Sequence, residues 1–147
     1  MKIRYKSKIF VSKLKLIGKV QIKNVMMAVL AAMKSDLSLN KILSSIDQLK
    51  PVEGRFEKVG SIKNNSKVIL DYAHTPEALE TILKNIKEQF PFNRISLVFG
   101  CGGDRDKDKR SLMGKIASKY SNKIYLTDDN PRSENPKKIR KEIKKHI

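Results

Sequence analysis

The sequence RISLVFGCGGDRDKDKRSLMGKIASKYSNKIYLTDD, residues 94–129, decides the fold. Two short apolar runs, at 94–100 and 123–129, are typical of buried strands, and the segment between them, 108–121, is expected to form a helix. A strand, a helix and a second strand in this order are the pattern of a parallel sheet with a crossover connection. We therefore predict two parallel strands joined by a helix.

The same alternation continues on both sides of this stretch. Residues 56–62 and 67–72 read as strands that form a hairpin turned at KNNS, residues 63–66. Residues 75–90 read as a helix whose Thr-Pro start supplies an N-cap and a first-turn proline, and residues 135–147 begin another helix. From this pattern we predict an α/β fold, namely a partial parallel, Rossmann-like sheet with crossover helices.

The N-terminal part of the chain follows a different pattern. Residues 8–22 alternate apolar and polar side chains and read as strands broken at Gly18. Residues 24–35 and 38–50 read as helices. The segment PVEGRF, residues 51–56, then looks like a boundary, because it combines a proline, a glycine and a change of pattern. We interpret what precedes it as a small α+β tail of another domain.

The domain organisation that we expect has two parts. Residues 1–50 form the end of one domain, and residues 51–147 form the first half of a second domain. The second domain is interpreted as incomplete because its last predicted helix is followed by no further strand.

The chain is strongly basic, with 32 Lys and Arg against 15 Asp and Glu and a net charge of +17. The excess lies mainly at the ends, since residues 1–23 hold eight basic residues and no acid, and residues 137–147 hold six against one. Solvated, lysine-rich faces explain this charge. A surface that binds nucleic acid or anionic small molecules would also carry it, so these readings stay open here.

Other features of the composition narrow the class of protein. The sequence has no run of 18 apolar residues, which predicts no membrane span, and its start lacks the apolar region of a signal peptide. The single cysteine cannot form an internal disulfide, and this suits a reducing cytosol. We find no metal-ligand cluster, no Ser-His-Asp spacing and no CxxC motif.

Polar side chains follow three of the predicted strands. The segments are VILDYAHTP (68–76), LVFGCGGDRDKDKR (97–110) and YLTDDNPR (125–132). Ligands of open parallel sheets bind beyond the carboxyl ends of the strands. We therefore expect all three segments to open at the same edge of the sheet.

Each segment also has an ordinary explanation. The glycines of GCGGD, residues 100–104, are explained by turn chemistry, and the segment matches neither a Walker loop nor GxGxxG. Asp71 and His74 could cap backbone groups, and the charges of residues 104–110 could form surface ion pairs. Together, however, the segments suit a charged small molecule, because an aspartate at a strand end can hold a ribose and the fork of Arg132 matches a carboxylate.

Four motifs in register resemble one known family. They are GRFE (54–57), DYAHTPEAL (71–79), FGCGGDRDKDKR (99–110) and TDDNPR (127–132), and they are similar to motifs of the Mur ligases, more narrowly of the MurE type. The segment LIGKVQIKNVMMAVLAA (16–32) resembles the end of the central ATPase domain of that family. The resemblance covers nearly the whole chain.

The resemblance implies an enzyme of peptidoglycan synthesis. Such a ligase uses ATP to activate a carboxylate of UDP-N-acetylmuramoyl-L-alanyl-D-glutamate as an acyl phosphate, and the amine of meso-diaminopimelate then forms the amide. Mg²⁺ assists the phosphoryl transfer. The implied partners are these small-molecule substrates, with no membrane or nucleic acid, in a cytoplasmic protein that is monomeric when full length.

The resemblance also implies roles for individual residues. The ATP-binding set would be Asn24, Arg55, Asp71 and His74. The set for meso-diaminopimelate would be Arg105, Asp129, Asn130, Pro131 and Arg132, with Lys107 as a weaker candidate. The chain departs from the family at Gln21, where an asparagine is usual. No catalytic residue and no Mg²⁺ ligand is assigned, because the family's phosphate-binding loop, magnesium ligands and carbamylated lysine have no counterpart in this sequence.

Three functional hypotheses follow. The first is a fragment of a diaminopimelate-adding ligase that is inactive alone. The alternative from another class is a truncated basic α/β module that binds nucleic acid nonspecifically. The third is a ligase of the same fold that acts on another substrate, such as folylpolyglutamate synthetase. The DNPR motif, residues 129–132, argues against this third hypothesis.

Overall fold

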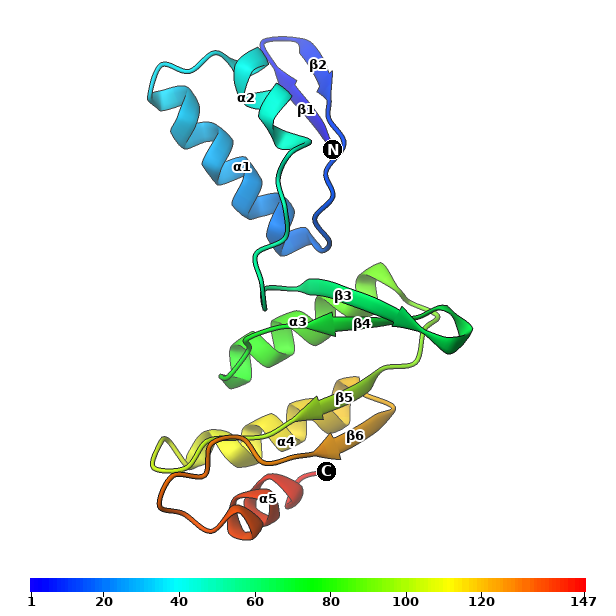
Figure 1. Cartoon of the computed structure of the whole chain (residues 1–147), viewed down its shortest axis with the longest axis vertical. Helices are drawn as coiled ribbons and strands as arrows, with labels where there is room; N and C mark the ends of the chain where they lie inside the picture. The colour runs from blue at the N-terminus through cyan, green and yellow to red at the C-terminus, as the bar shows by residue number, and fades with distance from the viewer. The chain divides into compact units, whose positions relative to one another are not determined.

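The computed structural model describes residues 1–147, apart from the side chain of residue 65. The chain divides into two compact units, Met1–Tyr72 and Ala73–Ile147 (Figure 1). Compactness does not define the limits of a family domain, so the expected division into residues 1–50 and 51–147 stays a prediction. Within the described chain, no helix is both long and apolar enough to cross a membrane.

The first unit begins with a small antiparallel sheet and two helices. Its elements are β1 (Lys2–Tyr5), β2 (Lys8–Val11), α1 (Lys19–Lys34) and α2 (Leu39–Ile46). Val25, Val29 and Ile46 are buried between the two helices, and apolar side chains of the N-terminal segment pack against them. Ser38 caps α2, its hydroxyl accepting a hydrogen bond from the amide of Lys41 at 3.4 Å.

The structure corrects two expectations for this region. The strands predicted over residues 8–22 end at Val11, and α1 begins at Lys19 instead of near Asn24. Gly18 does not break a strand: it has φ 91°, and a Cβ on it would lie 2.8 Å from the ring of Phe56. Two apolar residues with one residue between them, as at 20 and 22, fit a strand as well as a first helical turn. Hydrophobic periodicity therefore could not place the start of α1.

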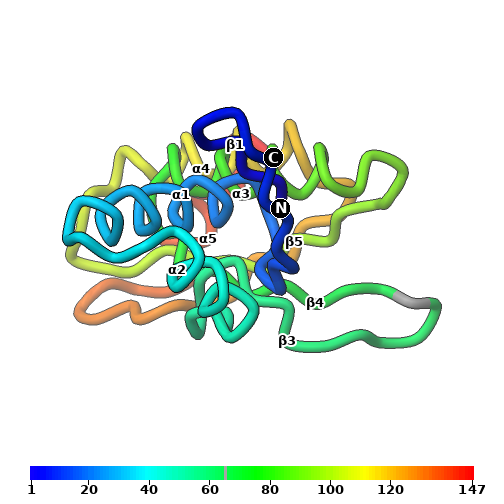
Figure 2. Tube along the Cα trace, turned by 90° about the horizontal axis from the view of Figure 1, so that it is seen from above, coloured from blue at the N-terminus to red at the C-terminus, as the bar shows by residue number. Residues whose placement is uncertain are grey.

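The second sheet of this unit is the hairpin predicted from the sequence. β3 (Glu57–Ile62) pairs antiparallel with β4 (Ser66–Leu70), with a register irregularity between Lys58 and Gly60. The connection is a short 3₁₀ turn, η1 (Lys63–Asn65), in which Asn64 takes a left-handed conformation that asparagine tolerates. Figure 2 shows the two strands running side by side as an extended hairpin.

The second unit contains the strand–helix–strand pattern that the opening stretch predicts. Its elements are α3 (Pro76–Gln89), β5 (Ser96–Phe99), α4 (Asp108–Tyr120), β6 (Lys123–Leu126) and α5 (Pro136–Lys144). β5 and β6 are parallel, with Phe99 opposite Leu126, which confirms the central prediction. The fold is therefore α/β, with a parallel strand pair and helices of the Rossmann-like kind.

Sequence signals at the helix starts of this unit are confirmed in detail. The hydroxyl of Thr75 accepts a hydrogen bond from the amide of Ala78 at 3.2 Å, and Pro76 occupies the first turn of α3. Asn135 caps α5 in the same way, accepting from the amide of Lys137 at 2.9 Å. These local caps fix where the two helices begin.

The core of the second unit lies between its helices and the strand pair. It contains Leu79 and Leu83 of α3, Met113 of α4, and Ile143 of α5, together with Ile95, Cys101 and Ile139. The Cys101 thiol lies 3.7 Å from the sulfur of Met113, and burial raises its pKa. The cysteine is therefore a packing residue of this core.

Gly114 sets how closely α4 and α5 approach each other. A Cβ placed on Gly114 would overlap the backbone carbonyl oxygen of Ile143, a group that no rotamer change can move. The glycine is therefore required by packing, at the cost of its low helix propensity.

Substituting Gly114→Ala should lower the free energy of unfolding by about 1–3 kcal/mol, because overpacking outweighs the better helix propensity of alanine. Urea denaturation followed by circular dichroism measures this. Gly60→Ala is the control, since nothing lies within 4 Å of its added Cβ, and it should stay within about 0.5 kcal/mol of the parent. A Gly114→Ala variant as stable as the parent would contradict the proposed close contact.

Candidate functional site

The loops that follow β5 and β6 lie side by side at one end of the second unit (Figure 1). The two strands are parallel, so the loops that follow them leave the sheet at the same edge. The amide of Gly103 in one loop donates to the carbonyl of Asn130 in the other at 2.8 Å. Two of the three segments expected to meet are thus neighbours. The third begins after β4 in the first unit, and the carbonyl of its His74, which lies in the second unit, accepts from the ammonium of Lys109 at 2.9 Å. The place of its first-unit residues beside the two loops stays a prediction.

The glycines after β5 allow this close approach. A Cβ on Gly100 would overlap the carbonyl oxygen of Thr127, and one on Gly103 would overlap that of Pro131. A Cβ on Gly102 would lie 2.9 Å from Nη1 of Arg132. None of the three has a positive φ. A left-handed turn conformation therefore does not explain these glycines: Gly100 and Gly103 let two backbones touch, and Gly102 leaves room for the Arg132 side chain.

The two loops are tied together by reciprocal hydrogen bonds. The carboxylate of Asp104 accepts from the amide of Ser133 at 3.0 Å and from its hydroxyl at 2.7 Å. In return, the amide of Asp104 donates to the carboxylate of Glu134 at 2.7 Å. We call this arrangement of residues 100–104 and 130–134 the loop clasp. The bonds from Ser133 hold the pKa of the Asp104 carboxyl below its ordinary value.

A buried arginine on α4 is hydrogen-bonded to both loops of the loop clasp. Arg110, in the first turn of α4, is fully buried, and its guanidinium donates to Glu134 at 2.8 and 2.9 Å and to Glu142 of α5 at 2.6 Å. It also donates to the carbonyl of Gly102 at 3.2 Å. The hydrogen bonds from Arg110, followed by the one from the Asp104 amide, lower the pKa of Glu134 from 4.5 to about 2.

Arg132 is exposed and held in an unusual backbone conformation. Its φ is 49°, a left-handed region that a long side chain rarely adopts. Its amide donates to the side-chain oxygen of Asn130 at 3.2 Å, the local bond by which asparagine forms turns. Nη1 donates to the carbonyl of Gly103 at 2.7 Å, which fixes one end of the guanidinium fork beside the loop clasp.

The other residues predicted for this site lie within the loop clasp or next to it. Asp129 and Pro131 flank Asn130, and the Pro131 carbonyl accepts from the amide of Glu134 at 3.0 Å. Arg105 is exposed on the loop after Asp104. Lys107 lies 3.8 Å from the Glu134 carboxylate, so its charge is engaged in the same network.

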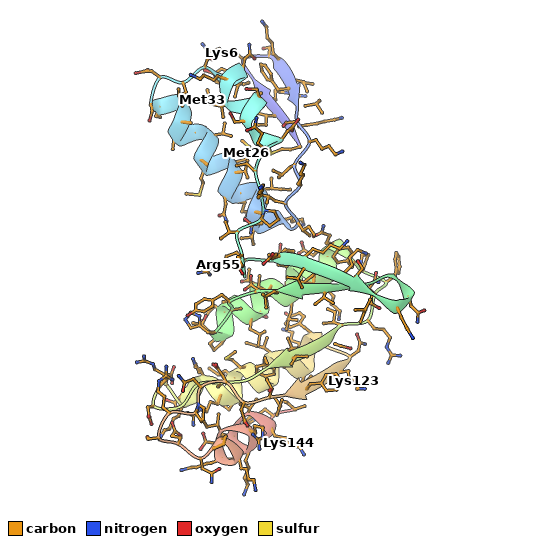
Figure 3. The ribbon with its side chains drawn as sticks, viewed as in Figure 1. Lys6, Met26, Met33, Arg55, Lys123 and Lys144 are labelled. Atoms are coloured by element: carbon orange, nitrogen blue, oxygen red, sulfur yellow. The ribbon has the colours of Figure 1, made fainter. Side chains whose placement is uncertain are left out.

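Two of the residues predicted to bind ATP, Asn24 and Arg55, are linked within the first unit. The Gln21 amide group donates to the carbonyl of Arg55 at 2.8 Å and accepts from Asn24 at 3.5 Å. Arg55, labelled in Figure 3 on the segment before β3, stacks on the ring of Tyr72 at 5.1 Å. Gln21, which departs from the family pattern, therefore connects Asn24 to the backbone of Arg55.

Asp71 has a backbone role in the same region. Its carboxylate accepts from the amide of Phe56 at 2.7 Å, and Phe56 itself has a φ of 49°. The expectation that Asp71 satisfies a backbone group is thus confirmed. His74 belongs to the second unit, where its carbonyl accepts from the ammonium of Lys109 at 2.9 Å.

Sequence reasoning missed the residues that hold the loop clasp. Arg110 could have been found, because it shares a helical face with Met113, Gly114 and Ala117, all of which are buried, and a charge on such a face needs a partner. Glu134 offered no comparable signal. Its partners come from α4 and from the loop after β5, both far from it in the sequence.

Comparison with known proteins identifies the family. Residues 54–147 match the sequence model described as "Mur ligase, glutamate ligase domain". The chain is 47% identical over 131 residues to the UDP-N-acetylmuramoyl-L-alanyl-D-glutamate–2,6-diaminopimelate ligase of Rickettsia felis, covering 87% of this chain and 24% of that protein. It is 41% identical over 143 residues to the protein of the same name from Brucella melitensis biotype 1, covering 97% and 29%. The chain thus spans about a quarter of the length of these relatives.

Solved structures agree with these sequence matches. A structure of a ligase of the same name is 34% identical, with a TM-score of 0.62, and the match covers 97% of this chain and 28% of that one. A folylpolyglutamate synthase from Thermotoga maritima is 26% identical, with a TM-score of 0.73, covering 95% and 33%.

The chain should lose stability in acid partly through Glu134. Its pKa in the folded protein lies below its ordinary value, so its contribution is complete above about pH 5 and is lost as the pH falls towards about 2. Glu134→Gln should therefore be less stable than the parent at about pH 7 and should depend less on pH between about 5 and 3. Urea denaturation across this range measures both. An unchanged pH dependence in the variant would contradict the assigned pKa.

Proposed function

Because the chain belongs to the Mur ligase family, we propose that it is part of an ATP-dependent ligase that adds meso-diaminopimelate to UDP-N-acetylmuramoyl-L-alanyl-D-glutamate. The relatives that carry the corresponding name are 41–47% identical to it. The observation that carries the proposal is the loop clasp, which presents Arg132 at the carboxyl edge of β5 and β6. Ligands of parallel sheets bind at this edge.

The proposed role of Arg132 is to bind the distal carboxylate of meso-diaminopimelate. Its planar fork suits a carboxylate, and the bond from Nη1 to Gly103 orients the fork beforehand. Asn130, Asp129 and Pro131 shape the turn around it, and Arg105 supplies a second exposed cation for the same amino acid. L-Lysine has no second carboxylate, so this site would discriminate against it.

ATP is the proposed nucleotide of the complete enzyme. Asn24 would lie near the adenine, and Arg55 would reach the nucleotide from the segment before β3. Asp71 would hold the ribose, with His74 beside the nucleotide. The bonds that position Asn24 and Arg55 through Gln21 support this grouping. Residues 1–50 would then be the end of the ATPase domain, and residues 51–147 the first half of the amino-acid-binding domain.

Mg²⁺ is proposed for the phosphoryl transfer of the complete ligase and is not assigned to any residue of this chain. Among the described residues, no three His, Cys, Asp or Glu side chains are grouped so that they could hold a metal ion. The sequence also contains no Walker loop to cradle the transferred phosphate. We therefore propose that these residues alone do not catalyse. As a separate proposal, which rests on the resemblance to the family, the complete ligase works as a cytoplasmic monomer.

The charge of +17 favours one other function, the nonspecific binding of nucleic acid. Titrating the chain with duplex DNA at two salt concentrations separates the two proposals. Tight binding that falls steeply with salt, without any response to diaminopimelate, would favour the basic module.

Arg132→Ala, in a complete ligase that contains these residues, should lower kcat/KM for meso-diaminopimelate by a factor equivalent to about 2–4 kcal/mol of transition-state stabilisation, because a hydrogen-bonded charge pair is lost. Steady-state kinetics with both amino acids measures this, and the low use of L-lysine should not change. Arg94→Ala is the matched control, since Arg94 is an exposed arginine before β5, away from the carboxyl edge. Unchanged use of meso-diaminopimelate in Arg132→Ala would contradict the carboxylate role.

A further inference from the structure

Arg110 joins four separate segments of the second unit. Its guanidinium lies on α4 and donates to the carbonyl of Gly102 after β5, to Glu134 after β6, and to Glu142 on α5. In the part of the chain that the structure describes, it is the only charged residue that is buried. An arginine is rarely buried completely unless acceptors surround it, so this position is built around a specific set of partners.

Glu134 is the partner that connects Arg110 to the loop of Arg132. One carboxylate oxygen accepts from both Nη2 of Arg110 and the amide of Asp104, and the other accepts from Nη1. Ser133, the residue between Glu134 and Arg132, is held by Asp104 through its amide and hydroxyl. The two residues that follow Arg132 are therefore both fixed to the opposite loop.

The backbone at Arg132 needs this support. A left-handed conformation is unfavourable for a residue with a long side chain and persists where the surrounding structure determines it. Within the loop itself, the Arg132 amide bonds only to the exposed side chain of Asn130, at 3.2 Å. The bonds of Ser133 and Glu134 to the loop after β5 are shorter, at 2.7 to 3.0 Å.

We propose that Arg110 is a positioning residue, which through Glu134 holds the strained Arg132 in place for the distal carboxylate of the amino-acid substrate. This inference rests on the proposed function of Arg132. Arg110 would not touch the substrate, because it is fully buried and its fork is occupied by Glu134, Glu142 and Gly102. Its effect would reach the ligand through two residues of backbone.

The matched pair Glu134→Gln and Glu142→Gln separates positioning from general stability. Each variant removes one negative charge from Arg110 and keeps an acceptor oxygen of the same reach. Glu134 lies in the loop clasp, whereas Glu142 lies on α5 and contacts Arg110 from outside the loop. A purely structural role predicts similar effects of both variants on the loop.

The first measurement is amide hydrogen exchange in the ¹⁵N-labelled 147-residue chain. The amides of Gly103 and Arg132 report directly on the loop clasp, since they donate to Asn130. We expect exchange at both amides to accelerate about tenfold or more in Glu134→Gln and to stay within about twofold of the parent in Glu142→Gln. Equal acceleration in the two variants would overturn the positioning role.

The second measurement is a titration of the same samples with meso-diaminopimelate, followed by amide chemical shifts. We expect the dissociation constant to rise about tenfold in Glu134→Gln and to stay within about twofold in Glu142→Gln. L-Lysine is the control ligand, and its weak shifts should be the same in all samples. Equal affinity of Glu134→Gln and the parent for meso-diaminopimelate would overturn the proposal.

Two further outcomes are distinguishable. If the parent chain shows no response to meso-diaminopimelate, the proposed carboxylate site fails, and selective exchange at Gly103 and Arg132 still decides whether Arg110 positions this loop. If Glu134→Gln does not fold, Glu134→Asp replaces it, because it keeps the charge opposite Arg110 but is too short to reach Arg110 and the Asp104 amide together. Unchanged exchange in Glu134→Asp would then overturn the proposal.

Discussion

The guanidinium of Arg110 is fully buried, and helices and loops of the second unit are hydrogen-bonded to it. A buried charge is tolerated only where acceptors surround it, and here Glu134, Glu142 and the carbonyl of Gly102 provide them. These acceptors come from α5 and from the loops after both parallel strands. Burying one arginine thus fixes the relative positions of two helices and two loops, and the depressed pKa of Glu134 is a consequence of the same contacts.

Close backbone approach is the second constraint, and it depends on missing side chains. Gly100 and Gly103 let the loop after β5 touch the loop after β6, and Gly114 lets α4 touch α5. The same close approach brings Glu134 within hydrogen-bond distance of both Arg110 and the amide of Asp104. The glycine-rich segment therefore forms a backbone–backbone contact within the chain. This contact in turn supports the exposed guanidinium fork of Arg132.

Local signals predicted the elements well where one signal dominated. The Thr-Pro start of α3, the Asn-Pro start of α5 and the strand–helix–strand pattern around α4 are all present, because caps and apolar runs act within a few residues. The start of α1 differs from the prediction, because the apolar residues at 20 and 22 fit a strand as well as a first helical turn. The residues proposed to bind substrate came from motif resemblance, and their bonding partners came only from the structure.

The sequence by itself determined the α/β class, the parallel pair of strands, the hairpin of β3 and β4, and the family to which the chain belongs. These follow from periodicity, turn residues and motifs that are local in the chain. The tertiary structure decided why the glycines after β5 are needed and how Arg132 is held, because both depend on residues about 30 positions apart that meet only after β5 and β6 pair. A hydrogen bond between distant residues leaves no local pattern, so only the folded chain shows that Arg110 and Glu134 act together.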